Sequence, residues 1–256
     1  MNINKLKFPL VVKPSDRSAG RGVVKVNNTE ELKIAYKNAK SLSNNGIVLV
    51  EEVLDGKQFS VETISENGIH IIVAITEEFF RQGKYEDDFL EVGHLIPARL
   101  NNKEKSKIQK ETLKILDAFE IKFGACHIEL KLDINGVKII EIASRMGGWR
   151  NTLIRDAYGY NINEMLLNVS LNKKMKFKEQ KNKFNAIVNF IFTKDDFEHY
   201  KWTRKKYPEF ISDDFVNAKD DTKFFYASDL LCSNGFYYLK IPPKTDMKQF
   251  LPKGYK

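Results

Sequence analysis

The sequence FGACHIELKLDINGVKIIEIA, residues 123–143, decides the fold. Its β-rich runs at 123–132 and 137–143 flank Ile134-Asn135-Gly136, a short segment with the composition of a hairpin turn. A three-residue turn would have Gly136 in the left-handed conformation, which glycine adopts without steric cost. The stretch therefore predicts an antiparallel hairpin, which is the best-defined element of the chain.

The hairpin brings two glutamates together. A three-residue turn pairs Glu129 directly with Glu141, with their Cβ atoms roughly 4.5–5.5 Å apart, where like charges destabilise a sheet. A cation between them would remove the repulsion, and carboxylate oxygens suit Mg²⁺ that carries nucleotide phosphates. The metal interpretation is favoured because Glu141 interrupts an otherwise apolar strand. The alternative is that neighbouring basic residues neutralise the pair: Lys131, Lys138 or Arg145.

A loop near the start of the chain has the composition of a phosphate-binding segment. The sequence KPSDRSAGRG, residues 13–22, lies between β-rich runs at 8–13 and 22–26. Small residues allow backbone N–H groups to approach phosphate oxygens, and Lys13 adds a positive charge. The segment lacks the Gly-Lys-Ser/Thr helix opening of a Walker loop. Taken alone, it could equally be an ordinary hairpin loop.

A second basic loop follows the predicted hairpin and reads SRMGGWR at residues 144–150. Arg145 could hold a transferring phosphoryl group, because its guanidinium can stabilise developing negative charge. Gly147 and Gly148 would let a substrate approach the backbone closely. The alternative is a strand-to-helix turn with surface arginines.

The rest of the chain predicts a mixture of strands and helices. Further strands are expected at residues 46–52, 57–64, 68–75, 184–192 and 236–241. Helical patterns extend from Asn28, as N-cap, to Leu42, and over residues 105–119 and 151–171. Residues 80–93 are charged and aromatic and are predicted to form a long loop.

Composition places the chain among ordinary globular proteins. It has 256 residues, of which 42% are hydrophobic and 30% charged, with a net charge of +8. No apolar run reaches the roughly 18–20 residues needed to cross a bilayer, and the first residues do not form a secretory signal. The basic residues form neither a nucleic-acid-binding motif nor a long basic block. We therefore expect a soluble cytoplasmic protein that binds neither nucleic acid nor a membrane.

In order and spacing, these segments resemble the ATP-grasp superfamily, closest to its branch of L-amino-acid ligases and carbamoyl-phosphate-synthase-like ligases. The similar segments, all within residues 6–171, are Phe8–Pro14, the loop at 15–22, Glu51–Gly56, Glu129 and Glu141–Arg145. The resemblance implies an α+β ATP-grasp fold, in which two α+β subdomains clasp ATP. We expect a small subdomain at residues 1–75, with the phosphate loop and adenine hinge, and a large one at 76–256, with the metal-ligand hairpin.

The resemblance also implies roles for particular residues. Lys13 would contact the ATP phosphates, and Arg145 would stabilise the acyl-phosphate transition state. Mg²⁺ would be held by Glu129 and Glu141. The phosphate loop would close over ATP through Ser15, Ser18, Gly20 and Gly22. Adenine and ribose would be met by Glu51, Glu52, Val53 and Gln58. An amino-acid substrate would be surrounded by Glu91, His94, Gly147, Gly148 and Trp149.

The sequence departs from the family pattern in three places. Ala143 stands where many relatives have an asparagine metal ligand. Gln58 stands where they often have a glutamate or histidine for the ribose hydroxyls, although an amide can still make such hydrogen bonds. The strand that carries Lys13 begins almost at Met1, so we expect the N-terminal domain that usually precedes the ATP-grasp unit to be lacking from this chain.

We therefore expect an ATP- and Mg²⁺-dependent carboxylate–amine ligase that acts through an acyl-phosphate intermediate. Its partners would be a small-molecule carboxylate and an amine, and the resemblance implies amino acids. The alternative is a non-catalytic ATP-binding fragment, or one half of a split ligase completed by a separate N-terminal domain chain. The sequence attaches no chemistry to residues 173–256.

Overall fold

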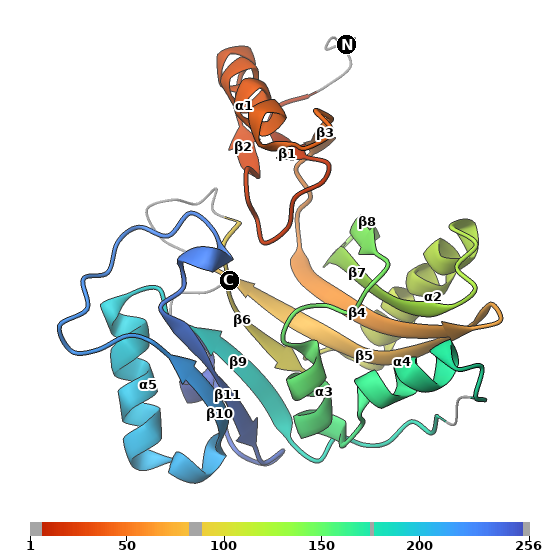
Figure 1. Ribbon diagram of the computed structural model, residues 1–256, viewed down its shortest axis with the longest axis vertical. Helices are drawn as coiled ribbons and strands as arrows, with labels where there is room; N and C mark the ends of the chain where they lie inside the picture. Colours follow the sequence, from red (N-terminus) through yellow and green to blue (C-terminus); the bar gives the residue numbers. More distant parts are fainter. Residues whose placement is uncertain (1–6, 82–88, 175–176, 253–256) are drawn as a thin grey trace.

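The computed structural model describes residues 7–81, 89–174 and 177–252, which form a small lobe above one large sheet (Figure 1). The small lobe contains β1 (Leu10–Pro14), β2 (Val24–Val26), α1 (Thr29–Leu42) and β3 (Val48–Glu52). Its sheet has the order β2-β1-β3, and α1 covers one face with a small apolar core. The predicted helix is confirmed, with the Asn28 side chain accepting a hydrogen bond from the Glu31 N–H.

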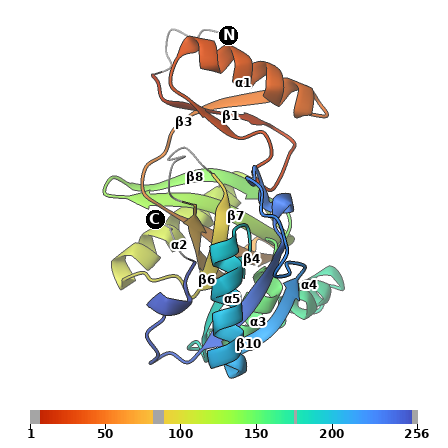
Figure 2. The same ribbon diagram turned by 90° about the vertical axis from the view of Figure 1, so that its left-hand side faces the viewer.

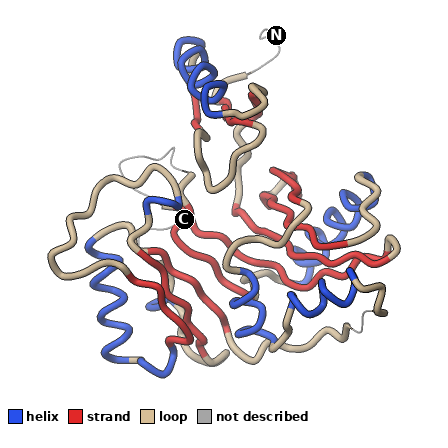
Figure 3. The backbone as a smooth tube through the Cα atoms, in the orientation of Figure 1, coloured by secondary structure: helices blue, strands red, loops and turns tan. Residues whose placement is uncertain are grey.

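The large sheet has eight antiparallel strands in the order β10-β11-β9-β6-β5-β4-β7-β8, and Figure 3 shows them as one continuous layer. The strands are β4 (Lys57–Glu66), β5 (Ile69–Phe80), β6 (Glu91–Ile96), β7 (Gly124–Asp133), β8 (Gly136–Ala143), β9 (Asn185–Phe190), β10 (Ile211–Val216) and β11 (Gly235–Ile241). The helices are α2 (Asn102–Ala118), α3 (Arg150–Tyr158), α4 (Ile162–Ser170) and α5 (Lys194–Lys206), with short 3-10 turns at Pro208–Phe210, Leu230–Cys232 and Lys248–Phe250. Among the described residues, no helix is long and apolar enough to span a bilayer.

Two apolar cores lie on opposite faces of the large sheet. Helix α2 buries Ile108 and Leu116 against one face, over β4 and β7. Helices α3 and α4 pack on the other face, where Leu153, Ile154 and Ile162 join the larger core. Turning the molecule shows the small lobe stacked over one end of the sheet (Figure 2). The face that carries α3 and α4, at its end near the small lobe, holds the polar residues described below.

The predicted pairing of Glu129 with Glu141 is confirmed, although the structure reaches it differently. Asp133 pairs with Gly136, so the turn itself contains only Ile134 and Asn135. A β-bulge then shifts the register between Glu129 and Leu130 by one residue and brings the two acids opposite each other. The expected three-residue turn is therefore wrong, whereas its consequence for the two glutamates is right.

Three other expectations need correction. The boundary at residue 75 moves to the segment between β3 and β4, because β4 and β5 pair within the large sheet. The long loop predicted at 80–93 is shorter at both ends, because β5 continues to Phe80 and β6 begins at Glu91, while residues 82–88 lie outside the described residues. The helix at 151–171 is two helices, because Gly159 takes a left-handed conformation with φ 82° and ends α3.

Candidate functional site

The candidate site is a cluster of charged side chains on the α3 and α4 face of the large sheet. Register places residues of four neighbouring strands side by side: Gln58, Ser60 and Glu62 on β4, Glu78 on β5, His94 on β6, and His127 and Glu129 on β7. Alternation along each strand aims these side chains to the same face. Helix α3 begins at Arg150 directly over them, so one guanidinium enters an otherwise acidic cluster.

The predicted metal pair lies at the edge of this cluster. Glu129 on β7 and Glu141 on β8 are direct neighbours, and Glu141 is solvent-accessible. The protein around the Glu141 carboxyl group and the nearby Glu129 carboxylate raise the pKa of Glu141, and the charges of Lys13 and Arg145 partly oppose this. Two oxygen donors that repel each other are a suitable environment for a hard divalent cation. The residues present therefore fit Mg²⁺, although its binding here stays a prediction.

Lys13 extends from the small lobe toward the same region. Its ammonium group is 2.7 Å from an Oε2 atom of Glu51, and its side chain is only 12% exposed. The two residues come from neighbouring strands, β1 and β3, whose open face is not covered by α1. The predicted phosphate contact and a predicted hinge residue thus form one ion pair within the small lobe, on the sheet face that α1 does not cover.

Glu129 is also the last member of a buried chain of hydrogen bonds. The Glu62 carboxylate lies 2.5 Å from His127 Nδ1, and His127 Nε2 lies 3.3 Å from the Glu129 carboxylate. Burial lowers the pKa of His127, but the hydrogen bonds with Glu129 and Glu62 outweigh it and raise the pKa to about 10. The imidazolium in turn holds the pKa of Glu129 below its usual value, against the effect of burial. Glu129 is therefore a fixed anion.

Arg150 organises the centre of the cluster. Its side chain is 2% exposed, and its guanidinium donates to Glu78 at 2.6 Å, to Ser60 at 3.0 Å and to His94 Nδ1 at 2.6 Å. Because arginine can only donate, His94 must accept at Nδ1 and carry its proton on Nε2. That proton is donated to the Glu91 carboxylate at 2.6 Å. Burial and the neighbouring guanidinium lower the pKa of His94 well below its usual value, so the ring is neutral.

Two buried acids in this cluster, Glu78 and Glu91, have too little positive charge nearby to balance their own negative charge. Burial, followed by the Glu91 and Glu129 carboxylates, raises the pKa of Glu78 to about 7. Burial and the Glu129 carboxylate likewise raise the pKa of Glu91 to about 7. Perturbed acids of this kind concentrate at functional sites, where burial and like charges are arranged to shift pKa values. Both Glu91 and His94, predicted around the substrate, belong to this network.

Other predicted residues lie at the margins. The Gln58 amide donates to Glu78 at 3.0 Å and to Glu129 at 3.3 Å, so it belongs to the acidic cluster. Glu52 pairs with Lys138 at 3.2 Å, across the two lobes. Val53 is half-buried in the segment that joins β3 to β4. The adenine and ribose roles of these residues stay predictions.

The predicted phosphate loop hangs from the small lobe toward the large sheet (Figure 1). Ala19 packs against the core of the large sheet, and a Cβ added at Gly20 would lie 3.9 Å from the Phe89 carbonyl oxygen. Gly22 has φ 76°, which strains any other residue, and a Cβ there would lie 2.8 Å from Leu42 and 3.0 Å from Pro14. Near the base of the loop, the Ser15 hydroxyl donates to Asn45 at 3.1 Å, and the Ser18 carbonyl accepts from Arg21. The loop is placed to reach a ligand between the lobes.

The second basic loop curves over the cluster. Arg145 is exposed and donates to the Met146 carbonyl, and Gly148 accepts from Arg150. Trp149 takes a left-handed conformation with φ 61° and packs edge-on against Phe190, with ring centroids 4.8 Å apart. Its ring lies 6.1 Å from that of His94. Trp149 and His94 thus come together as predicted, although part of the Trp149 surface is used for packing.

Sequence reasoning missed four central residues: Glu62, Glu78, His127 and Arg150. The first two had a signal, because each is an acid within a β-rich run, as Glu141 is. No pattern in the sequence distinguished Arg150 from Arg145, the other arginine of the same loop. Within the described residues, two groups could also hold a metal, namely Glu78 with His127 and Glu129, and Glu78 with Glu91 and His94. The protonated His127 and the Arg150 contact to Glu78 disfavour a metal ion there.

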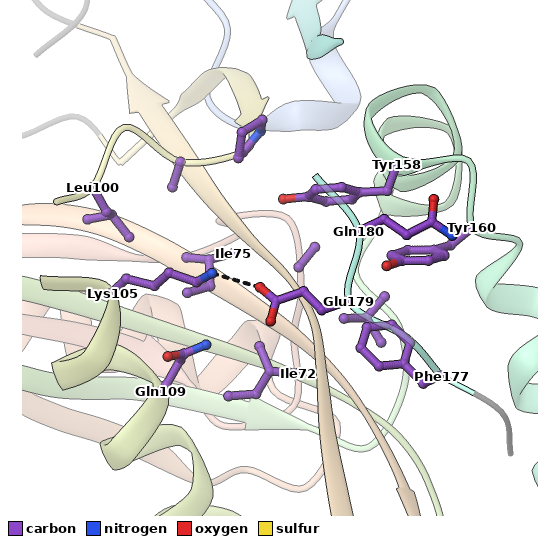
Figure 4. Close-up of a pocket in the computed structure, with 14 residues that line it drawn as sticks. Ile72, Ile75, Leu100, Lys105, Gln109, Tyr158, Tyr160, Phe177, Glu179 and Gln180 are labelled. Atoms are coloured by element: carbon purple, nitrogen blue, oxygen red, sulfur yellow. Dashed lines mark hydrogen bonds and ion pairs between the residues drawn. The ribbon is translucent and has the colours of Figure 1, made fainter. Parts of the chain in front are cut away.

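A separate cavity of about 280 Å³ lies beside residues 72–75 of β5, beyond the end of β6 at Ile96 (Figure 4). It is enclosed between α2 and residues 177–180. Tyr158, Tyr160 and Phe177 form one wall. The charged groups at its rim satisfy each other, with Lys105 and Glu179 2.9 Å apart across the opening. The cavity shares no residue with the acidic cluster, so it is not the candidate site.

Comparison with known proteins gives concordant results. A family model described as the ATP-grasp domain matches residues 6–153. The carbamoyl phosphate synthase large chain of Caldanaerobacter subterraneus is 30% identical over 173 residues, which are 67% of this chain and 16% of that protein. The crystal structure of an L-amino acid ligase from Bacillus licheniformis is 25% identical with a TM-score of 0.75, covering 96% of this chain and 61% of that one. N5-carboxyaminoimidazole synthetase from Staphylococcus aureus, complexed with ADP, is 17% identical with a TM-score of 0.66, covering 95% and 59%, and shares the fold.

Proposed function

We propose, since this chain belongs to the ATP-grasp family, that it binds Mg·ATP between the small lobe and the large sheet and serves to join a carboxylate to an amine. Family membership confirms the resemblance and the fold that the sequence predicts. The chain spans 16% of the length of the carbamoyl phosphate synthase relative, so the reaction is proposed from this chain's own residues.

The observation that carries the proposal is the direct pairing of Glu129 with Glu141, with Lys13 and Arg145 within electrostatic range. Two carboxylates beside two positively charged side chains suit a metal–triphosphate complex. The carboxylates would hold the metal, and the positively charged side chains would hold phosphate oxygens. When bound, Mg²⁺ would neutralise phosphate charge. Lys13 on the small lobe and Arg145 on the large sheet would then orient the terminal phosphoryl group from two sides.

The reaction proposed has two steps. A carboxylate oxygen of the substrate attacks the γ-phosphorus, the bond to the ADP oxygen breaks, and an acyl phosphate forms. The neutral amine then attacks the acyl carbon, inorganic phosphate leaves with the bonding electron pair, and the nitrogen loses a proton. Arg145 would stabilise the charge that develops on the transferring phosphoryl group, and positioning by the surrounding residues would supply much of the remaining acceleration.

The acidic cluster supports an ammonium-bearing carboxylate, such as an amino acid, as substrate. Too little positive charge surrounds the carboxyl groups of Glu91 and Glu78, as their raised pKa values indicate. An α-ammonium group beside Glu91 would relieve this repulsion, and the Trp149 ring would contact an apolar side chain. His94, neutral and held by Arg150, would keep the Glu91 carboxylate in place.

ADP release, measured over a panel of amino acids singly and in pairs, tests the proposal. We expect release only with Mg²⁺ and at least one amino acid, and its loss in the Arg145→Met variant. Release that is indifferent to every amino acid, in a preparation that binds Mg·ATP, would contradict the ligase assignment. That outcome would favour the alternative, a nucleotide-binding module that works with a separate domain or chain.

A further inference from the structure

We propose that Glu62 is a positioning residue that holds the strand of Glu129 and the loop of Arg145 in one fixed arrangement. The proposal rests on the proposed function, because it takes Glu129 as a metal ligand and Arg145 as a phosphoryl-contacting group. Glu62 itself is entirely buried on β4, with 0% of its side chain exposed. Its Oε1 atom lies 2.5 Å from His127 Nδ1 and 3.7 Å from Arg150 Nε, and its Oε2 atom accepts a hydrogen bond from the Gly147 backbone N–H.

The first contact reaches the metal-ligand strand. Glu62 Oε1 lies 2.5 Å from His127 Nδ1, and the opposite ring nitrogen lies 3.3 Å from Glu129. The histidine ring is therefore fixed between two carboxylates, one buried and one at the candidate metal site. Hydrogen-bond partners placed behind a ligand in this way orient it, and their loss typically weakens metal binding about 10–100-fold.

The second contact reaches the basic loop. The backbone N–H of Gly147 donates to Glu62 Oε2 at 3.0 Å. A Cβ at Gly147 would lie 2.6 Å from His127 Nδ1 and 2.7 Å from Glu62 Oε1, so only glycine permits this approach. Gly147 is two residues from Arg145 and two from Trp149. One carboxylate thus sets the distance between the loop and the metal-ligand strand.

The alternative is that Glu62 only stabilises the fold, and a matched control variant at another buried glutamate tests it. Glu77 on β5 is also buried, at 3% exposure, and accepts three hydrogen bonds from the backbone and guanidinium of Arg99. It lies on the strand next to β4 but belongs to none of the contacts around Glu129. Glu77→Gln therefore reproduces the loss of a buried carboxylate outside the site.

The first test needs no nucleotide. In protein labelled with ¹⁵N-glycine, the Gly147 amide is identified by its disappearance in Gly147→Ala. We expect Glu62→Gln to move that amide proton upfield, because a neutral acceptor replaces a carboxylate, and Glu77→Gln to leave it unchanged. An unmoved Gly147 amide in Glu62→Gln would overturn the proposal.

The second test measures the Mg²⁺ concentration at which ATP gives half of its maximal thermal stabilisation. Glu62→Gln and Gly147→Ala should each raise it about 10–100-fold, and the double variant should raise it by less than the product of the two, since both act through one contact. Glu77→Gln should match wild type. Wild-type Mg²⁺ dependence in either single variant would overturn the role of Glu62. Wild-type protein without any Mg²⁺-dependent stabilisation would instead overturn the proposed function.

Discussion

Glu77 and Glu78 are neighbours on β5, and they lie in opposite kinds of environment. Glu77 faces the α2 side of the sheet, where the backbone N–H and guanidinium of Arg99 donate to it at 2.7–3.0 Å. Glu78 faces the candidate site, where Arg150 and Gln58 contact it, but burial, followed by the Glu91 and Glu129 carboxylates, raises its pKa to about 7. Both acids are buried and both meet an arginine. The difference is that only Glu78 is surrounded by further acids.

This difference separates a structural ion pair from a site prepared for a cation. An isolated buried pair contributes little beyond compensating its own desolvation. In the acidic cluster, one guanidinium and one imidazolium serve the carboxylates of Glu62, Glu78, Glu91 and Glu129. The excess of negative charge destabilises this cluster, and the ammonium group of a ligand would relieve it.

Replacing Arg150 and Arg99, one at a time, should give the largest difference between the two faces of β5, measured as loss of unfolding free energy. Arg150→Met leaves Glu78 buried without its cation, so the free energy of unfolding should fall by about 3–5 kcal/mol. Arg99→Met should cost less, about 1–3 kcal/mol, because Arg99 is 37% exposed and water can replace part of its contact. Urea unfolding of both variants measures this. Equal losses would remove the distinction between the two faces of β5.

The second-largest difference between Glu77 and Glu78 should appear in how the free energy of unfolding depends on pH. The folded-state pKa of Glu78 and of Glu91 is raised from 4.5 to about 7. Between these values the folded protein retains protons that the unfolded chain has released, so their contribution to stability falls as the pH rises through this interval and then stays constant. Glu78→Gln should flatten the decline between about pH 5 and pH 7.5 by roughly 1–3 kcal/mol.

Glu77→Gln is the control for this slope, since it changes the neighbouring residue and leaves the acidic cluster intact. Its free energy of unfolding should decline with pH as that of the wild type does. Urea titrations at several pH values, without divalent ions, make the comparison. A slope that Glu78→Gln leaves unchanged would show that Glu78 is ionised throughout.

The smallest expected effect is confined to substrate choice. Trp149→Ala removes the ring beside His94 while leaving the metal pair and Lys13 in place. We expect it to change which amino acids stimulate ADP release, with Mg·ATP affinity changed less than about threefold. Isothermal titration with ATP and the ADP assay separate the two effects. Loss of ATP binding would instead show that Trp149 supports the fold, through its contact with Phe190.

Local patterns predicted the parts of the site that are close in sequence. Alternation and a glycine turn predicted the pairing of Glu129 with Glu141, although the structure reaches it through a shorter turn and a bulge. The capping residue Asn28 marked its helix correctly. In each case the determining contacts lie within a few residues of one another.

The remainder depends on contacts between distant segments. Arg150 meets Ser60 from 90 residues away and Glu78 from 72, and Glu62 meets His127 from 65. Nothing in a single sequence specifies which of several buried acids a given arginine meets. The same limitation explains the misplaced boundary at residue 75, because strand pairing assigns β4 and β5 to the large sheet.

The central claim is that Glu129 and Glu141 share a metal that carries ATP, and the thermal shift of one variant tests it most directly. With Mg·ATP at about 100 times its dissociation constant, wild-type protein should gain about 2.7 kcal/mol of stability, and less with ATP and a chelator. Glu141→Gln should lose the Mg²⁺-dependent part, whereas Glu111→Gln, which changes an acid of α2 that pairs with Lys114, should retain it. Equal stabilisation with and without Mg²⁺ in the wild type, or an unchanged response in Glu141→Gln, would contradict the account.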